Sequence, residues 1–278
     1  MTKTIVLTGA SDGIGAAAAR QLKAKDHHVV LVGRSKEKTE KLARELDAPY
    51  HLADFTKLRD VERLATELDA YPTIDVLANN AGGIMGNREV TEDGFEKTFQ
   101  VNHLAGFHLT KLLLPKLIAS KAKVIQTSSE AANLFGKTFD INDLNNEGNY
   151  SATNAYGNGK LANIYFTWEL QNRYVAKGIS AVAFHPGVVR TSFASETNHF
   201  MRFMYHTPLK YLITITPEKS AEALVALIEG TPGVDWEPGG VYSKGQPMRV
   251  QAIDDGTTAK LLWEKSEEML STLSSYKK

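Results

Sequence analysis

The chain of 278 residues contains no cysteine. This absence excludes disulfide bonds, thiolate metal ligands and a catalytic thiol, and it is typical of a reducing compartment, so we expect a cytoplasmic location. Basic residues and acidic residues both number 32, so no excess charge indicates binding to nucleic acid or to anionic membranes. No apolar run approaches the ~18 residues that a membrane-spanning helix needs, so no membrane anchor is expected. No group of residues has the spacing of metal ligands, and no metal is predicted.

Short apolar segments alternate with longer segments of helical periodicity along the whole chain. The apolar segments do not alternate with polar residues, as expected for parallel strands that helices cover on both faces. The predicted strands are 5–8, 29–32, 50–52, 74–78, 124–127 and 181–184, and the main predicted helices are 16–25, 36–46, 58–68, 93–120 and 155–177. We therefore predict an α/β protein with a single Rossmann-type doubly wound fold, a central parallel sheet of about seven strands and helices on both faces. Residues 1–278 are expected to form one domain.

A glycine-rich turn, with Gly9, Gly13 and Gly15, follows the first predicted strand and opens the first helix. The N-terminus of a helix presents unpaired N–H groups and a positive dipole end, which attract a pyrophosphate. The same turn could be a tight connection that binds no ligand. Its position directly after the first strand favours a dinucleotide site.

The second predicted strand ends at Arg34 and Ser35, where an acidic residue would bind the ribose 2′-hydroxyl of NAD. The chain has no acid there, and an arginine can hold a 2′-phosphate with two parallel hydrogen bonds. Arg34 could instead be an ordinary surface residue. The missing carboxylate independently favours NADP(H) as the cofactor.

Tyr156 and Lys160 are four residues apart, which places them on one face of a helix. The pKa of a free tyrosine is near ~10, and a neighbouring ammonium favours the phenolate and lowers that pKa. The pair could then act as a general acid or base. Taken alone, the pair could equally be two surface residues of a helix.

Several motifs share one order with a known family. They are the turn at residues 8–15, Asp54, the Asn-Asn-Ala-Gly segment 79–82, Asn102, Ser129, the pair Tyr156 and Lys160, and the Pro-Gly segment 185–191. In this order they resemble the short-chain dehydrogenase/reductase family over essentially the whole chain. Segments 143–145, 150–163 and 262–267 resemble its retinol-dehydrogenase-like branch. Gly159 departs from the family pattern, which often has Ser there, and a glycine within a helix costs about 1 kcal/mol of helix stability.

The resemblance implies four catalytic residues. Tyr156 would protonate a carbonyl oxygen, Ser129 would hydrogen-bond the same oxygen, Lys160 would tune Tyr156 and bind the nicotinamide ribose, and Asn102 would hold a water in a proton relay. As isolated residues, Ser129 and Asn102 could simply satisfy backbone groups. The cofactor-binding residues implied by the resemblance are Gly9, Ser11, Asp12, Gly13, Ile14, Gly15, Arg34, Ser35, Asp54, Phe55, Asn80, Ala81, Gly82, Tyr156, Lys160, Pro186, Gly187, Val189 and Thr191.

Residues 192–217 are rich in aromatic residues and methionine and follow the predicted nicotinamide segment directly. We interpret them as a lid over an apolar pocket, although two short packing helices or an interface patch would have the same composition. The resulting hypothesis is an enzyme that transfers hydride between NADP(H) and a small hydrophobic carbonyl or alcohol, acting as a carbonyl reductase. The alternatives are a non-catalytic NADP-sensing protein and a retinoid or pigment reductase. A homo-oligomer, either dimer or tetramer, is expected because the long helices 93–120 and 155–177 form the family's usual dimer surface.

Overall fold

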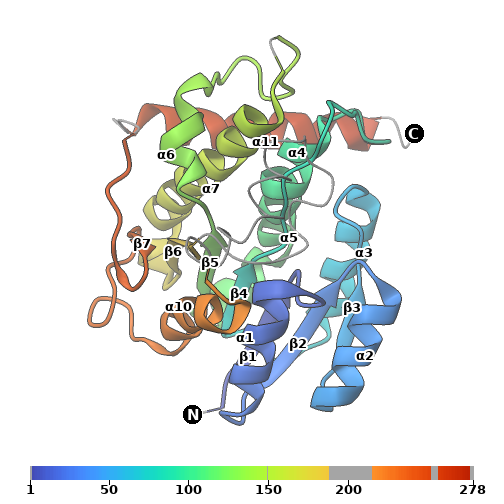
Figure 1. Cartoon of the computed structure of the whole chain (residues 1–278), viewed down its shortest axis with the longest axis vertical. Coiled ribbons are helices and arrows are strands. Elements are labelled where there is room, and N and C mark those ends of the chain that lie inside the picture. Colours follow the sequence, from blue (N-terminus) through green and yellow to red (C-terminus); the bar gives the residue numbers. More distant parts are fainter. Residues whose placement is uncertain (1, 149, 188–214, 252–255, 276–278) are drawn as a thin grey trace.

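The computed structural model describes residues 2–148, 150–187, 215–251 and 256–275. Within these ranges, eight strands form one sheet in the order β3-β2-β1-β4-β5-β6-β7-β8 (Figure 1). The strands are β1 (Thr4–Thr8), β2 (His28–Gly33), β3 (Tyr50–Leu52), β4 (Val76–Asn79), β5 (Lys123–Thr127), β6 (Ser180–His185), β7 (Val241–Ser243) and β8 (Gln246–Pro247). All pairs from β3 to β7 are parallel, and β8 pairs antiparallel with β7. The predicted doubly wound parallel fold is confirmed, with β8 as a short antiparallel addition at the edge.

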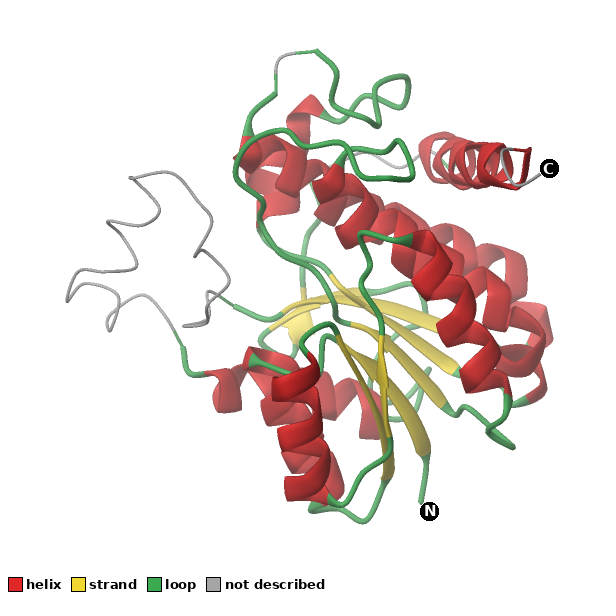
Figure 2. Ribbon diagram, turned by 90° about the vertical axis from the view of Figure 1, so that its right-hand side faces the viewer, coloured by secondary structure: helices red, strands yellow, loops and turns green. Residues whose placement is uncertain are grey.

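Helices cover both faces of the sheet, as Figure 2 shows edge-on. The longer ones are α1 (Gly13–Lys23), α2 (Lys36–Leu46), α3 (Leu58–Asp69), α5 (Ala105–Ala119), α7 (Ala152–Tyr174), α10 (Pro217–Glu229) and α11 (Thr257–Ser275). Residues of α1, α2 and α10 share one buried cluster, and residues of α3, α5, α7 and α11 share another. Along β1, Val6 belongs to the second cluster while Ile5 and Leu7 belong to the first. Both faces of each strand are therefore buried, which explains why the strands are apolar throughout.

The predicted helix 93–120 is not continuous. Glu96 begins it, because its carboxylate accepts hydrogen bonds from the backbone N–H groups of Thr98 and Phe99 at 2.7 and 2.8 Å. The short helix α4 (Lys97–Phe99) then runs into a π-helical segment (Gln100–Leu104) before α5 starts. Such single π-turns are frequent at functional sites, and this one contains Asn102.

Helix α7 passes very close to α6 (Ala131–Phe135), because α7 presents a glycine where the two helices meet. A β-carbon at Gly157 would lie 2.6 Å from Cβ of Phe135 and 2.8 Å from the carbonyl oxygen of Ala131. The second glycine of α7, Gly159, faces the π-helical segment instead, and a β-carbon there would lie 3.3 Å from Cβ of Asn102. Helix α7 therefore lacks side chains at two contact points. One faces α6, which follows Ser129, and the other faces Asn102.

One buried aromatic residue, Trp263, packs the C-terminal helix α11 against both α5 and α7. The ring of Trp263 lies edge-on to Phe107 of α5 at 5.0 Å between centroids, and the guanidinium of Arg173 lies 4.8 Å above the Trp263 ring. Trp263 is only 2% exposed. None of the helices in the described part of the chain is long and apolar enough to cross a membrane.

We expect Gly157→Ala to destabilise the fold although alanine favours helices by about 1 kcal/mol. The new methyl group would meet backbone atoms of α6 that cannot swing away, and overpacking of this kind costs typically about 1–3 kcal/mol. Gly159→Ala is the matched control and should destabilise less, because the nearest atom to a β-carbon there is 3.3 Å away, compared with 2.6 Å at Gly157. Thermal unfolding of both variants checks this, and equal melting temperatures would contradict the close contact between α6 and α7.

Candidate active site

A cavity of about 710 Å³ opens at the carboxyl ends of the central strands. It lies where β1 pairs with β2 on one side and β4 on the other, which is the switch point of a doubly wound sheet. The predicted residues that line it are Gly9, Ser11, Asp12, Gly13, Ile14, Gly15, Arg34, Ser35, Asp54, Phe55, Asn80, Ala81, Gly82, Ser129, Tyr156, Lys160, Pro186 and Gly187. Val189 and Thr191 lie outside the described residues, as does most of the predicted lid 192–217.

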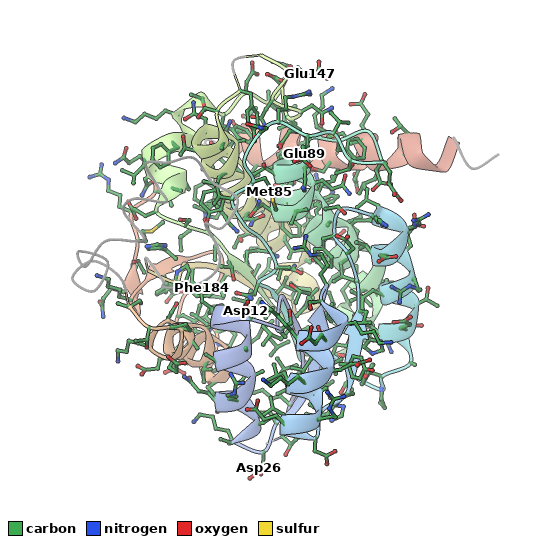
Figure 3. The ribbon with its side chains drawn as sticks, turned by 45° about the vertical axis from the view of Figure 1, so that its right-hand side comes forward. Asp12, Asp26, Met85, Glu89, Glu147 and Phe184 are labelled. Carbon is green, nitrogen blue, oxygen red and sulfur yellow. The ribbon has the colours of Figure 1, made fainter. Side chains whose placement is uncertain are left out.

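The glycine turn is shaped by close backbone contacts. Gly9 has a φ of 65°, and a β-carbon there would lie 2.8 Å from Cα of Ala81. A β-carbon at Gly15 would lie 2.2 Å from the carbonyl oxygen of Gly9. Asp12 caps α1 by accepting from the N–H of Gly13 at 2.7 Å, and Figure 3 shows Asp12 at the start of this helix. A helix N-terminus that borders a cavity in this way fits the pyrophosphate of a dinucleotide.

Asn80 connects the ends of three strands. Its side-chain amide donates to the carbonyl oxygen of Thr8 at 3.0 Å, and its side-chain oxygen accepts from the hydroxyl of Thr127 at 3.2 Å. The hydroxyl of Thr8 accepts in turn from the backbone N–H groups of Asn80 and Ala81. Asn80 therefore fixes the glycine turn against β4 and β5 as well as lining the cavity.

Positive charge gathers where β2 ends. Arg34 is exposed, lines the cavity and has no hydrogen bond or ion pair to another described residue. Lys38, one helical turn further along α2, also lines the cavity, and its ammonium lies 2.6 Å from the carboxylate of Asp12. Lys38 was not predicted from the sequence, although its position four residues after Arg34 places it one helical turn away. The two cations and the capped N-terminus of α2 at Ser35 fit an additional phosphate group.

Tyr156 and Lys160 lie together on α7, as their spacing predicts. Tyr156 is 9% exposed and Lys160 is 2% exposed. The ammonium nitrogen Nζ of Lys160 lies 5.5 Å from the centroid of the Tyr156 ring and donates to the carbonyl oxygen of Thr127 at 3.1 Å. Burial lowers the pKa of Lys160 to about 7, because a desolvated ammonium is less stable than a neutral amine.

The two serines after β5 have different surroundings. Ser128 is buried, and its hydroxyl donates to the carbonyl oxygen of Lys160 at 2.7 Å, so it supports α7. Ser129 lines the cavity, and its oxygen accepts from the N–H of Ala131 at 3.2 Å. The hydrogen of its hydroxyl group can still be donated to a ligand. Both serines border the cavity, but the hydroxyl of Ser128 is bonded to the Lys160 carbonyl, so Ser129 is better placed to donate to a ligand.

Asn102 is buried behind the cavity and does not line it. Its side-chain nitrogen donates to the carbonyl oxygens of Gly83 and Thr98 at 2.7 and 2.8 Å, and its side-chain oxygen accepts from the N–H of Gly83 at 3.0 Å. Its backbone carbonyl accepts from the amide of Asn163 at 3.0 Å. The side chain therefore fixes the loop beside Gly82, where a β-carbon would lie 2.9 Å from Nζ of Lys160.

Several apolar side chains that were not predicted line the same cavity, and four of the larger ones follow two of the motifs closely. They are Ile84 and Met85, which follow the Asn-Asn-Ala-Gly segment, and Leu134 and Phe135 of α6, which follow Ser129 closely. In Figure 3, Met85 lies above Asp12, and both residues line the cavity. Because they follow segment 79–82 and Ser129 closely in the sequence, their place near the site could have been predicted. They give the cavity an apolar wall beside Ser129 and Tyr156.

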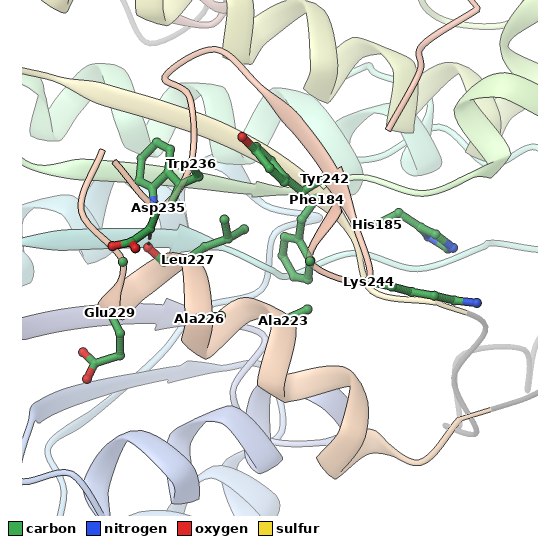
Figure 4. Close-up of a pocket in the computed structure, with 12 residues that line it drawn as sticks. Phe184, His185, Ala223, Ala226, Leu227, Glu229, Asp235, Trp236, Tyr242 and Lys244 are labelled. Carbon is green, nitrogen blue, oxygen red and sulfur yellow. Dashed lines mark hydrogen bonds between the residues drawn. The ribbon is translucent and has the colours of Figure 1, made fainter. Parts of the chain in front are cut away.

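A second cavity, of about 420 Å³, lies between α10 and the strands β6 and β7 (Figure 4). It contains none of the four predicted catalytic residues. His185 lines it, and burial lowers the pKa of this imidazole. No group of three or more acidic or histidine side chains in the described part of the chain is arranged to hold a metal ion.

Comparisons with known proteins agree with this geometry. The family model described as short chain dehydrogenase matches residues 3–202. A protein of Streptomyces sp. (strain C5), described as a daunorubicin C-13 ketoreductase, is 40% identical over 95% of this chain and 91% of its own length. Human retinol dehydrogenase 13 is 33% identical over 96% of this chain and 84% of its own length.

Among solved structures, that of an uncharacterized protein from Mycobacterium paratuberculosis has a TM-score of 0.74 and 31% sequence identity, covering 96% of this chain and 92% of that chain. The alcohol dehydrogenase of Thermococcus sibiricus, at 24% identity and a TM-score of 0.68 over 91% of this chain and 100% of that chain, shares the fold. The chain therefore belongs to the short-chain dehydrogenase/reductase family, in its retinol-dehydrogenase-like branch, and is an oxidoreductase that acts on alcohol or carbonyl groups with a nicotinamide cofactor.

Proposed function

We propose that the protein is an NADP(H)-dependent carbonyl reductase for a hydrophobic ketone or aldehyde. The observation that carries this proposal is that Tyr156, Lys160 and Ser129 line one cavity together with the glycine turn. The cavity can therefore hold a dinucleotide and a carbonyl group next to a tyrosine that can exchange a proton. A non-catalytic NADP-sensing protein would not need Tyr156 and Lys160 buried side by side.

Bound nicotinamide supplies the hydride for reduction and accepts it for oxidation. The hydroxyl of Tyr156 donates its proton to the carbonyl oxygen as the carbon is reduced. The hydroxyl of Ser129 hydrogen-bonds the same oxygen and stabilises the negative charge that develops on it. Lys160 would hold the nicotinamide ribose, and its ammonium would favour the phenolate that Tyr156 becomes. Asn102 keeps the neighbouring loop in place through Gly83.

The charges at the end of β2 support NADP(H) over NAD(H). Arg34 and Lys38 border the cavity, and no carboxylate stands at the end of β2 to bind a ribose 2′-hydroxyl. Lys38 is already paired with Asp12, which leaves the guanidinium of Arg34 as the better partner for a 2′-phosphate. Asp54 and Phe55 line the same side of the cavity, where we place the adenine.

The apolar wall of Ile84, Met85, Leu134 and Phe135 supports a hydrophobic substrate. The ketoreductase relative is consistent with a ketone. The retinol dehydrogenase relatives favour retinal, an apolar aldehyde, as a second candidate on the same scaffold. We further propose that the protein is a cytoplasmic homo-oligomer. Helix α11 covers α5 and α7 around Trp263. A dimer surface on α5 and α7 therefore has to lie beside α11 or include it.

We expect Tyr156→Phe to lower kcat by about 10²–10⁴-fold, the usual contribution of a general acid. Binding of NADPH, followed by fluorescence titration, should stay nearly unchanged because the ring is retained. Tyr50→Phe is the control, since the Tyr50 hydroxyl contacts Glu40 at the surface. Turnover by Tyr156→Phe at the wild-type rate would disprove the mechanism.

We expect Arg34→Asp to weaken NADPH binding by about 10- to 100-fold, since hydrogen bonds to charged groups contribute about 1.5–3 kcal/mol. NADH has no 2′-phosphate, so its binding should change far less. Arg44→Asp makes the same charge change on the far end of α2 and should leave both affinities alone. Equal losses for the two cofactors in Arg34→Asp would contradict the assignment of Arg34.

A panel of carbonyl compounds tests the substrate class. NADPH oxidation should be faster with aryl ketones, long-chain aldehydes or retinal than with glyceraldehyde of similar reactivity. Leu134→Ser should raise KM for the apolar compounds, because it removes apolar area from the cavity, and should not change NADPH affinity. A preference for the polar aldehyde would rule out the hydrophobic substrate class.

A further inference from the structure

A chain of buried polar side chains links the C-terminal helix to Lys160. We infer that Asn163, oriented by His103 and Ser266, is a positioning residue that holds the carbonyl group to which Lys160 is bound. The inference extends the function proposed above and rests on it for the catalytic importance of Lys160. It makes α11 part of the support of the active site, although α11 does not line the cavity.

The amide of Asn163 contacts two backbone carbonyl groups of the site. Asn163 lies three residues after Lys160 on α7, so both side chains project from neighbouring positions of one helix face. Its nitrogen Nδ2 donates to the carbonyl oxygen of Asn102 at 3.0 Å and to that of Thr127 at 3.2 Å. The same Thr127 oxygen accepts from Nζ of Lys160 at 3.1 Å. The amide and the ammonium therefore share one acceptor.

The direction of each hydrogen bond follows from these contacts. Because Nδ2 of Asn163 faces two carbonyl oxygens, its Oδ1 is left as an acceptor for Nδ1 of His103, at 3.3 Å. Burial lowers the pKa of His103 to about 4, so the ring is neutral and carries one hydrogen, on Nδ1. Nε2 of His103 is then an acceptor and receives the hydroxyl of Ser266 at 3.2 Å.

The three side chains of this hydrogen-bonded chain are buried, so water does not readily replace a lost partner. Asn163 is 3% exposed, His103 is 1% and Ser266 is 0%. A buried polar group that loses its partner keeps the full cost of desolvation, so each bond in the chain constrains the next one. Ser266 is itself held in place because Trp263, one turn earlier on α11, is packed against Phe107 and Phe166.

One amide thus contacts the backbone of Asn102 and the end of β5, and it does so from the helix that carries Tyr156 and Lys160. It binds the backbone of Asn102 directly, and it contacts Lys160 through the Thr127 carbonyl. Thr127 ends β5 two residues before Ser129, and Asn163 follows Tyr156 on α7. Rotation of this amide would loosen the carbonyl groups on which the position of Lys160 depends.

The test measures the titration of the Lys160 ammonium group. Protein labelled with ¹³C on lysine Cε is titrated by NMR, and the Lys160 signal is identified by its absence in Lys160→Met. In Asn163→Ala, the Thr127 oxygen is left to Lys160 alone and water can enter the space, and both changes favour the charged ammonium. The titration midpoint of Lys160 should therefore move to higher pH. The kcat for a carbonyl substrate should fall about tenfold or more, because small misplacements of catalytic groups have effects of this size.

Ser266→Ala tests the link to α11 with a milder change, since it keeps every bond of Asn163 and should fold even if Asn163→Ala does not. Its Lys160 midpoint should move in the same direction by a smaller amount. Ser271→Ala is the matched control on the same helix, because the Ser271 hydroxyl binds only the carbonyl oxygen of Glu268 at the surface. A Lys160 midpoint in Ser266→Ala equal to that of Ser271→Ala would overturn the inference. The NMR result needs no turnover, so wild-type protein that reduces no carbonyl would count against the proposed function alone.

Discussion

Burial of the Lys160 ammonium is the constraint on which the site depends. An ammonium group taken out of water needs hydrogen-bond acceptors in fixed positions, and here the Thr127 carbonyl at the end of β5 provides one. Space for it exists because position 82 is glycine and because Gly159 lets α7 approach Asn102. The π-helical turn brings the Asn102 carbonyl to the same region, where Asn163 satisfies it. The glycines provide space for the buried ammonium. The π-helical turn and the buried amides hold the backbone carbonyl groups around it in place.

The dinucleotide half of the cavity is built on backbone contacts, and the substrate half on side chains. Around the glycine turn, a β-carbon at Gly9 or Gly15 would meet backbone atoms within 3 Å, so the shape there cannot change without moving β1 or α1. The apolar wall comes instead from a short helix and a loop, where Leu134 is 62% exposed. Substitutions there change little in the core. The wall can therefore vary while the glycine turn stays fixed.

Local patterns in the sequence predicted the sheet, the glycine turn and the shared face of Tyr156 and Lys160, because each depends on residues close together in the chain. The resemblance had pointed to Ser129, and the fold adds what no local pattern shows, namely that the neighbouring Ser128 binds the Lys160 carbonyl. The π-turn at Asn102 was also missed, because periodicity alone indicates a continuous helix. The hydrogen bond between His103 and Ser266 was not predicted either, because the two residues lie 163 positions apart. Contacts over that distance leave no local pattern to read.

The low pKa of Lys160 has a consequence for the order of events at the site. Burial lowers the pKa of Lys160 to about 7, so this ammonium loses its proton more readily than that of an exposed lysine. The phosphates of a dinucleotide bring negative charge into the same cavity, and negative charge nearby favours the charged ammonium. Cofactor binding and protonation of Lys160 are therefore linked, and each strengthens the other by the same free energy. The charge of the cofactor thus favours the ammonium form of the lysine, which is the form that Tyr156 needs beside it.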